Sequence, residues 1–294
     1  MNKVIQPIHV YSLLFLSVSF LAHFVLIPTI FTVVEREAWI SALVSLIPIL
    51  LFALFISRLT NSCNNTSFFE LQSFQINRPL YLFIVTSYIV YLFSATFVSL
   101  KFTIIWAEES FNSDYPYFIT VILFILLCFY GSLKGLKTIA ILSLIICSLY
   151  IFLFVLLNLG NSMNNEYELL LPVNTSNTPS ILWGILYICI GILEMGFILI
   201  VLNSYVKEQM KRTGILIFST LFVLLVFIAI VTTVSEFGIY LTKKMLFPIN
   251  EQWRVLSFGK YFTRLDFRFF ICSPNIINGF YSYMFIYVYC VILF

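Results

Sequence analysis

The chain has 294 residues, of which 61% are hydrophobic and only 10% are charged. Its mean hydropathy of +1.03 excludes a soluble globular domain and is typical of proteins that cross a membrane several times. The formal net charge is only +3, so the distribution of charge among the loops is more informative than its sum.

Eight apolar stretches predict transmembrane helices and together indicate one all-α polytopic domain over residues 1–294. They cover residues 10–34, 38–56, 80–102, 117–130, 139–157, 181–202, 215–237 and 267–294. Most reach the length of about 20 residues that crosses a hydrocarbon core, and the fourth needs its flanks to do so. The first continues past Pro28, beyond the length of a signal peptide, so we interpret it as a span.

Charged loop residues predict the orientation. With the N-terminus in the cytoplasm, the inner loops are mainly basic, since they hold Lys3, Arg58, Arg78, Lys134, Lys137, Lys207, Lys211 and Arg212 against Glu70 and Glu208. The positive-inside rule therefore places the N-terminus in the cytoplasm. The loop of residues 239–264 departs from the rule, because it carries several basic residues on the predicted outer side. We expect this long loop to contain short surface or re-entrant helices.

Two spans carry residues that interrupt helices. Pro28 lies inside the first span and predicts a break at Leu26, Ile27 and Pro28, because proline removes a backbone hydrogen bond. In the sixth span, residues 190–196 read IGILEMG and place Gly191 and Gly196 on either side of Glu194. A charge at mid-span costs roughly 3 kcal/mol on insertion scales, so Glu194 is expected to face the protein interior.

The two interrupted spans lie five apart in chain order, as in transporters built from an inverted repeat of five helices. The ends of broken helices offer free amides and carbonyls to a ligand. This interpretation predicts a ligand site made by Leu26, Ile27, Pro28, Gly191, Glu194 and Gly196. The alternative is that Glu194 is a protonated carboxyl in a kink that only packing stabilises.

Other polar residues indicate structural roles. His23 lies one turn before the predicted first break, where an interior, hydrogen-bonded histidine is favoured over a ligand contact. Glu236 closes the seventh span and is expected at the water boundary. The sequence contains no Ser-His-Asp order, metal-ligand cluster or phosphate-binding glycine loop, so it favours neither an enzyme nor a bound cofactor or metal.

Several stretches also carry a resemblance. They are Leu26-Ile27-Pro28, residues 35–41 (EREAWIS), residues 170–173 (LLPV), the Gly191 and Glu194 region, Phe237-Gly238 with Phe247-Pro248, and residues 264–266 (RLD). In their order and spacing they resemble the permease subunits of spore germination nutrient receptors. These are the B subunits of GerA-type receptors, within the amino acid–polyamine–organocation transporter superfamily. The resemblance covers roughly residues 7–268.

This resemblance implies an inverted-repeat, amino acid permease-like fold of ten helices in the spore inner membrane. It implies a larger A subunit and a lipoprotein C subunit as partners, and a small nutrient germinant such as an amino acid as ligand. By position, the ligand pocket would be framed by Leu26, Ile27 and Pro28 and by residues 191–196. From about residue 269 the sequence departs from the family, so we expect a C-terminally truncated chain of about eight spans with a divergent tail over residues 269–294.

Three functions follow as hypotheses. The first is a membrane subunit of a germinant receptor that binds a small nutrient and helps trigger spore germination. The second is a proton-coupled amino acid transporter that uses Glu194 as the coupling carboxylate. The third is a truncated, non-functional relative, in which the tail is either frame-shifted or a shortened natural variant. None of the three involves a nucleic acid.

Overall fold

The computed structural model describes residues 4–62, 77–111, 117–171 and 178–256. In chain order the elements are α1 (Pro7–Leu21), the π-helical turn η1 (Ala22–Leu26), α2 (Ile27–Val33), η2 (Glu35–Glu37), α3 (Ala38–Ser62), α5 (Arg78–Phe111), α6 (Tyr117–Lys134), α7 (Leu136–Asn161), η3 (Tyr167–Leu170), α8 (Thr178–Leu202), η5 (Asn203–Tyr205), α9 (Arg212–Thr242) and α10 (Pro248–Val255). Within these residues the only β pairing is an isolated bridge between Ile5 and Val206. The predicted all-α fold class is confirmed.

Six described helical segments are long and apolar enough to cross a membrane. They are Pro7–Val33, Glu35–Ser62, Arg78–Trp106, Leu136–Asn161, Pro179–Tyr205 and Arg212–Thr242. These match the first, second, third, fifth, sixth and seventh predicted spans, and α6 occupies the position of the fourth. The predicted eighth span and the tail of residues 269–294 lie outside the described residues. The chain is an integral, multi-pass membrane protein.

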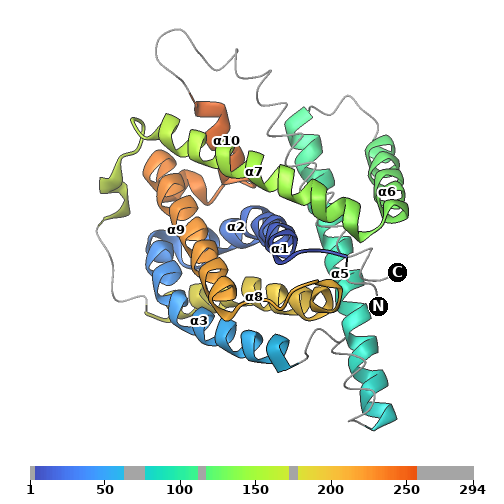
Figure 1. Cartoon of the computed structure of the whole chain (residues 1–294). Coiled ribbons are helices and arrows are strands. Elements are labelled where there is room, and N and C mark those ends of the chain that lie inside the picture. Colours follow the sequence, from blue (N-terminus) through green and yellow to red (C-terminus); the bar gives the residue numbers. More distant parts are fainter. Residues whose placement is uncertain (1–3, 63–76, 112–116, 172–177, 257–294) are drawn as a thin grey trace.

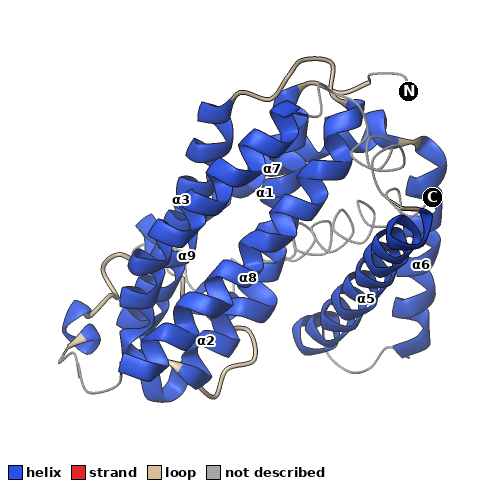
Figure 2. Ribbon diagram, turned by 90° about the horizontal axis from the view of Figure 1, so that it is seen from below, coloured by secondary structure: helices blue, strands red, loops and turns tan. Residues whose placement is uncertain are grey.

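The first span lies at the centre of the described helices. Figure 1 shows α1 and α2 between α7 and α8, with α3 and α9 completing the bundle. Of the 18 most apolar consecutive residues of the first span, 67% are buried, whereas only 17% are buried in the corresponding stretch of α5. Figure 2 shows α5 and α6 standing beside the main bundle. Because every side of the first span is apolar, its sequence carries no amphipathic signal of this central position.

Small residues let the helices of the bundle approach closely. In α3, buried Ser41, Ala42, Ser45 and Ala53 recur at helical spacing on the side that packs on α8 and α9. Opposite them, a β-carbon on Gly184 of α8 would lie 2.5 Å from the Oγ atom of Ser41. Contacts between small residues are a common basis of helix association in membranes, where lipid tails remove the hydrophobic driving force.

The basic residues that break the predicted charge rule each have a local partner in the described part of the chain. The pairs are Lys243 with Glu35, Lys244 with Tyr240, and Arg254 with Glu251. The three cations all belong to the loop of residues 239–264, which was predicted to hold short surface or re-entrant helices, and α10 confirms that this loop contains a short helix. Lys260 and Arg264 lie outside the described residues. Local pairing therefore explains how these cations are accommodated on the predicted outer side.

Candidate functional site

At the predicted break the first span stays helical from Pro7 to Val33, but it contains a wider π-helical turn. Between α1 and α2, the five residues of η1 form a π-helix, which the amide of Ile27 closes by donating to the carbonyl of Ala22. Pro28 follows directly and has no N–H group, so the preceding turn loses one helical donor. The Thr29 hydroxyl donates to the carbonyl of Val25 at 2.6 Å and satisfies one acceptor of this turn. Single π turns of this kind often mark functional sites.

The sixth span passes this turn at Gly191. A β-carbon on Gly191 would lie 3.2 Å from the Cδ1 atom of Leu26 and 4.0 Å from the Cζ atom of Phe222. The two segments predicted to frame one site therefore do come together, since Gly191 lets α8 approach η1. Leu26 and Ile27 are buried, and Pro28 is half-buried.

The predicted break in the sixth span is wrong. The α8 helix runs without interruption from Thr178 to Leu202, through Gly191, Glu194 and Gly196. Its glycines keep their helical hydrogen bonds and provide space instead. A β-carbon on Gly196 would lie 2.8 Å from the Cζ atom of Phe52, so Gly196 faces α3 and not the π turn.

Glu194 lies on the buried side of α8, as expected for a carboxyl group at mid-span. Its exposed fraction is 5%. It lies three residues after Gly191, so both residues occupy one side of the helix. Glu194 is therefore placed near the junction of α8 with the first span, within a helix that stays continuous.

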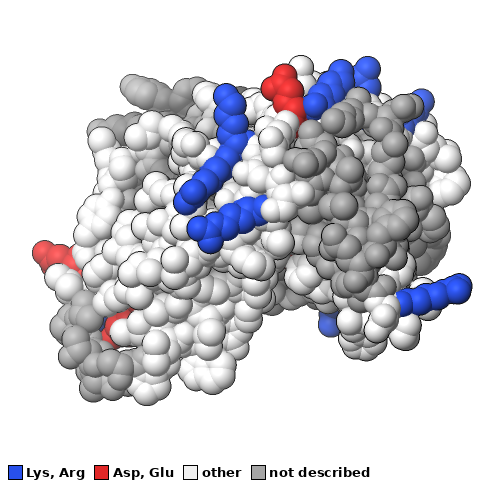
Figure 3. Space-filling view, turned by 60° about the horizontal axis from the view of Figure 1, so that its bottom comes forward, with Lys and Arg blue, Asp and Glu red and all other residues white. Residues whose placement is uncertain are grey.

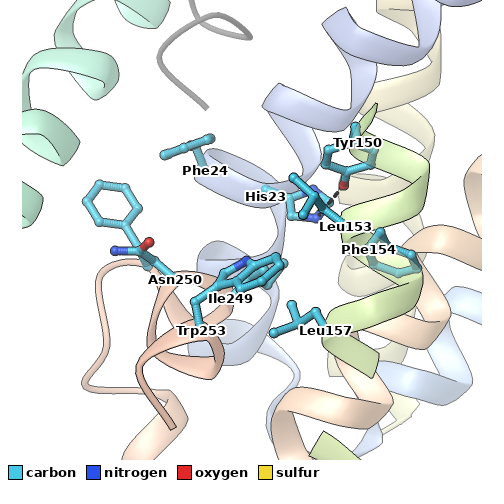
Figure 4. A pocket seen from close by; sticks show the side chains of 10 residues that line it. His23, Phe24, Tyr150, Leu153, Phe154, Leu157, Ile249, Asn250 and Trp253 are labelled. Carbon is cyan, nitrogen blue, oxygen red and sulfur yellow. Dashed lines mark hydrogen bonds between the residues drawn. The ribbon is translucent and has the colours of Figure 1, made fainter. Parts of the chain in front are cut away.

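A cavity of about 40 Å³ opens beside the π turn, between η1, α7 and α10. It is lined by His23, Phe24, Tyr150, Leu153, Phe154, Leu157, Phe247, Ile249, Asn250 and Trp253. None of these residues carries an acidic or a lysine or arginine side chain. Figure 4 shows the α10 side chains Ile249 and Trp253 on one side and the α7 side chains on the other.

The central polar feature of the cavity is a hydrogen-bonded histidine. The Nδ1 atom of His23 lies 2.8 Å from the carbonyl oxygen of Ser19, and its Nε2 atom lies 2.9 Å from the Tyr150 hydroxyl. A carbonyl only accepts, so Nδ1 carries the proton and the Nε2 atom of the neutral ring accepts from Tyr150. Figure 4 shows the Tyr150 hydroxyl directed at the imidazole. The two bonds fix the ring at the edge of the cavity.

The short helix α10 forms one wall and is attached to the bundle by a buried amide. Asn161 at the end of α7 is 2% exposed, and its Nδ2 atom donates to the Gln252 carbonyl at 3.0 Å. The same Nδ2 atom lies 3.3 Å from Glu236 Oε2 of α9. The Phe247 ring, just before α10, contacts the Phe24 ring with centroids 5.3 Å apart. These contacts hold α10 against η1, α7 and α9.

Comparison with known proteins decides the family. Residues 6–294 match the spore permease family, which is described as "Spore germination protein". The chain belongs to this family of spore germination proteins. It is 25% identical over 256 residues to Spore germination protein XB of Bacillus anthracis. The aligned region covers 85% of this chain and 70% of that protein. No solved structure matches it significantly.

The match confirms the resemblance to the B subunits of GerA-type receptors. It extends to residue 294 and so includes the segment after residue 268 that we interpreted as a divergent tail. A role in spore germination follows from the family.

The cavity of this spore germination protein differs from the predicted site. Leu26, Ile27, Pro28, Gly191, Glu194 and Gly196 do not line it, although the adjacent His23 and Phe24 do. Sequence reasoning identified His23 as an interior, hydrogen-bonded residue, which the structure confirms. It missed Tyr150, Phe154 and Leu157. Their spacing along one side of the fifth span was the available signal.

Proposed function

We propose that this chain is the nutrient-binding membrane subunit of a spore germinant receptor. The observation that carries this proposal is the cavity at the π turn, which lies between the central span and the short helix α10. A ligand in this position contacts η1, α7 and α10 at once. Binding can shift the arrangement of these elements only if the ligand prefers one arrangement over another.

The lining of the cavity favours an uncharged, aliphatic group. A charged group would lose its hydration there, and none of the described lining residues offers a counter-charge. The volume of about 40 Å³ is a few times the 10–15 Å³ or so that one water needs. The cavity therefore suits a small alkyl group, such as the side chain of a small apolar amino acid, and excludes an aromatic ring unless α10 moves.

The family supports the rest of the assignment. We propose a location in the spore inner membrane with the N-terminus in the cytoplasm, and assembly with a larger A subunit and a lipoprotein C subunit. The charge of the described loops supports this orientation, because exposed Arg58, Lys207, Lys211 and Arg212 occur at the ends of spans assigned to the inner side. Figure 3 shows most of its Lys and Arg side chains in the upper half of the view, with others at the lower right and the lower edge.

Deletion and reconstitution test the proposal. Spores that lack this chain are expected to lose the germination response to one class of small apolar nutrient and to regain it when the gene is restored. Proteoliposomes that contain the purified chain are expected to bind that nutrient without accumulating it under a proton gradient. Robust proton-driven uptake would replace the receptor function with transport, and an unchanged response of the deleted spores would contradict both.

The buried carboxyl of Glu194 favours transport as the second candidate, because a proton carrier in the membrane needs such a group. We expect Glu194→Gln to change the half-maximal nutrient concentration about fivefold, since it alters one buried polar contact worth roughly 1 kcal/mol, while protein abundance stays normal. The measurement is germination rate against nutrient concentration. Glu168→Gln, in the exposed η3, is the matched control. An unchanged dose response in a stably inserted Glu194→Gln protein would remove Glu194 from the site.

A further inference from the structure

A second and larger cavity lies at the beginning of the first span. Its volume is about 470 Å³, and it is formed where α1 and α9 both begin. The α9 helix has 31 residues and runs from this cavity toward α10, whereas the first cavity lies beside η1, more than halfway along the first span. None of the residues that line the second cavity also lines the first.

One wall of this second cavity is apolar and faces outward. Ile8 of α1 and Ile217 of α9 line it, and their exposed fractions are 51% and 56%. Each lies in the first two turns of its helix, and each helix is a membrane span. Exposed isoleucine on a membrane span is covered by lipid chains, so this wall adjoins the hydrocarbon core just below the membrane surface.

The other wall is polar and contains a cation. Lys211 and Thr213 line it at the beginning of α9, and both are exposed. Lys211 occupies the N-cap position without a side-chain cap, so the positive end of the helix dipole adds to its charge. Exposed Lys207 and Arg212 flank the cavity, and Glu208 is the acidic residue among its described lining.

The backbone around the cavity is fixed. The amides of Val4 and Ile5 donate to the Tyr205 carbonyl at 2.9 and 3.2 Å, and the amide of Lys207 donates to the Ile5 carbonyl at 2.9 Å. The Tyr11 ring lies between the two walls. Its hydroxyl fits there because Gly214 has no β-carbon, which would collide with the hydroxyl oxygen. The cavity is thus a feature of the folded bundle and not of a loose terminus.

We propose that this cavity binds an anionic phospholipid, with the headgroup phosphate at Lys211 and an acyl chain along Ile8 and Ile217. Basic pockets between membrane helices recognise such headgroups, and each nearby cation contributes about 1 kcal/mol. A free phosphate ester shares the headgroup chemistry. The exposed apolar wall favours the lipid, since a soluble ester would leave it without a partner. This site is independent of the nutrient cavity.

Native mass spectrometry of the purified full chain tests the proposal. The protein is titrated with phosphatidylglycerol or phosphatidylcholine, and with glycerol 1-phosphate as the soluble arm. We expect phosphatidylglycerol to bind preferentially, and Lys211→Gln to weaken that binding about fivefold. Glu208→Gln is expected to strengthen it, because it removes the opposing charge. Lys137→Gln changes an exposed lysine at the start of α7, outside the cavity, and is expected to leave binding unchanged.

The three variants alter exposed side chains, so each is expected to remain folded and monodisperse. Equal binding of phosphatidylglycerol by wild type and Lys211→Gln would overturn the site, as would an equal loss in Lys137→Gln. Competition by glycerol 1-phosphate as strong as that of the lipid would show that the acyl wall contributes nothing and would overturn the lipid assignment. Weaker binding by Glu208→Gln would overturn the proposed role of charge.

Discussion

Gly191→Val is expected to reduce the germination response at least tenfold while the protein still inserts into the membrane. A β-carbon at this position already lies 3.2 Å from Leu26, and valine adds two methyl groups beyond it. Overpacking of this kind costs roughly 1–3 kcal/mol, and here the strain falls on the contact between α8 and the π turn. The measurement is the germination rate of spores that carry the variant, with protein abundance determined on the same membranes.

The control for this prediction is Leu193→Val. It places the same residue type in the same turn of α8, on a side chain that is 43% exposed. We expect a normal response from this variant. A normal response from Gly191→Val as well would show that the close contact of α8 with the first span is dispensable for signalling.

Tyr150→Phe is expected to raise the half-maximal nutrient concentration about tenfold. The change removes the hydroxyl that lies 2.9 Å from His23 Nε2 and leaves a ring acceptor unpaired in an apolar cavity. An unsatisfied buried polar group costs roughly 1–3 kcal/mol, and a change of 1.4 kcal/mol in binding is tenfold. The measurement is the dose response of germination, supported by nutrient binding to the purified protein.

Tyr130→Phe serves as the matched tyrosine control, because Tyr130 is 58% exposed on α6. We expect it to leave the dose response unchanged. The thermal stability of Tyr150→Phe separates the two possible roles of the hydroxyl. A weaker response at unchanged stability indicates a role in the ligand cavity, whereas an unchanged dose response would place the nutrient elsewhere.

Hydropathy was sufficient to predict the fold class and the described spans. It could not predict which span is central, because a helix that is apolar on all sides looks the same in lipid and in a protein core. The first span is buried and α5 is peripheral, yet both are continuous apolar stretches in the sequence. That difference depends on contacts between helices far apart in the sequence, such as Gly191 of α8 against Leu26 of the first span.

The candidate site was predictable only in part. Pro28 has a direct effect on backbone hydrogen bonding, so it correctly indicated an irregular turn in the first span. Gly191 has no such effect, because glycine keeps its amide, and the sixth span remains helical. Tyr150 and Trp253 line the same cavity as His23 but lie more than 100 residues away in the sequence, so no local pattern could show that the three belong together.

The central position of the first span has a consequence for biogenesis. Its polar side chains bond to helices that are synthesised much later, since Ser12 meets Ser143 at 2.8 Å across 131 positions and His23 meets Tyr150 across 127. The first span therefore enters the membrane before α7 is synthesised, when the Ser12 hydroxyl and the Nε2 atom of His23 still lack these partners. Such late, long-range pairing is slow and leaves intermediates exposed. Insertion machinery that shields the first span would then control the yield of folded protein.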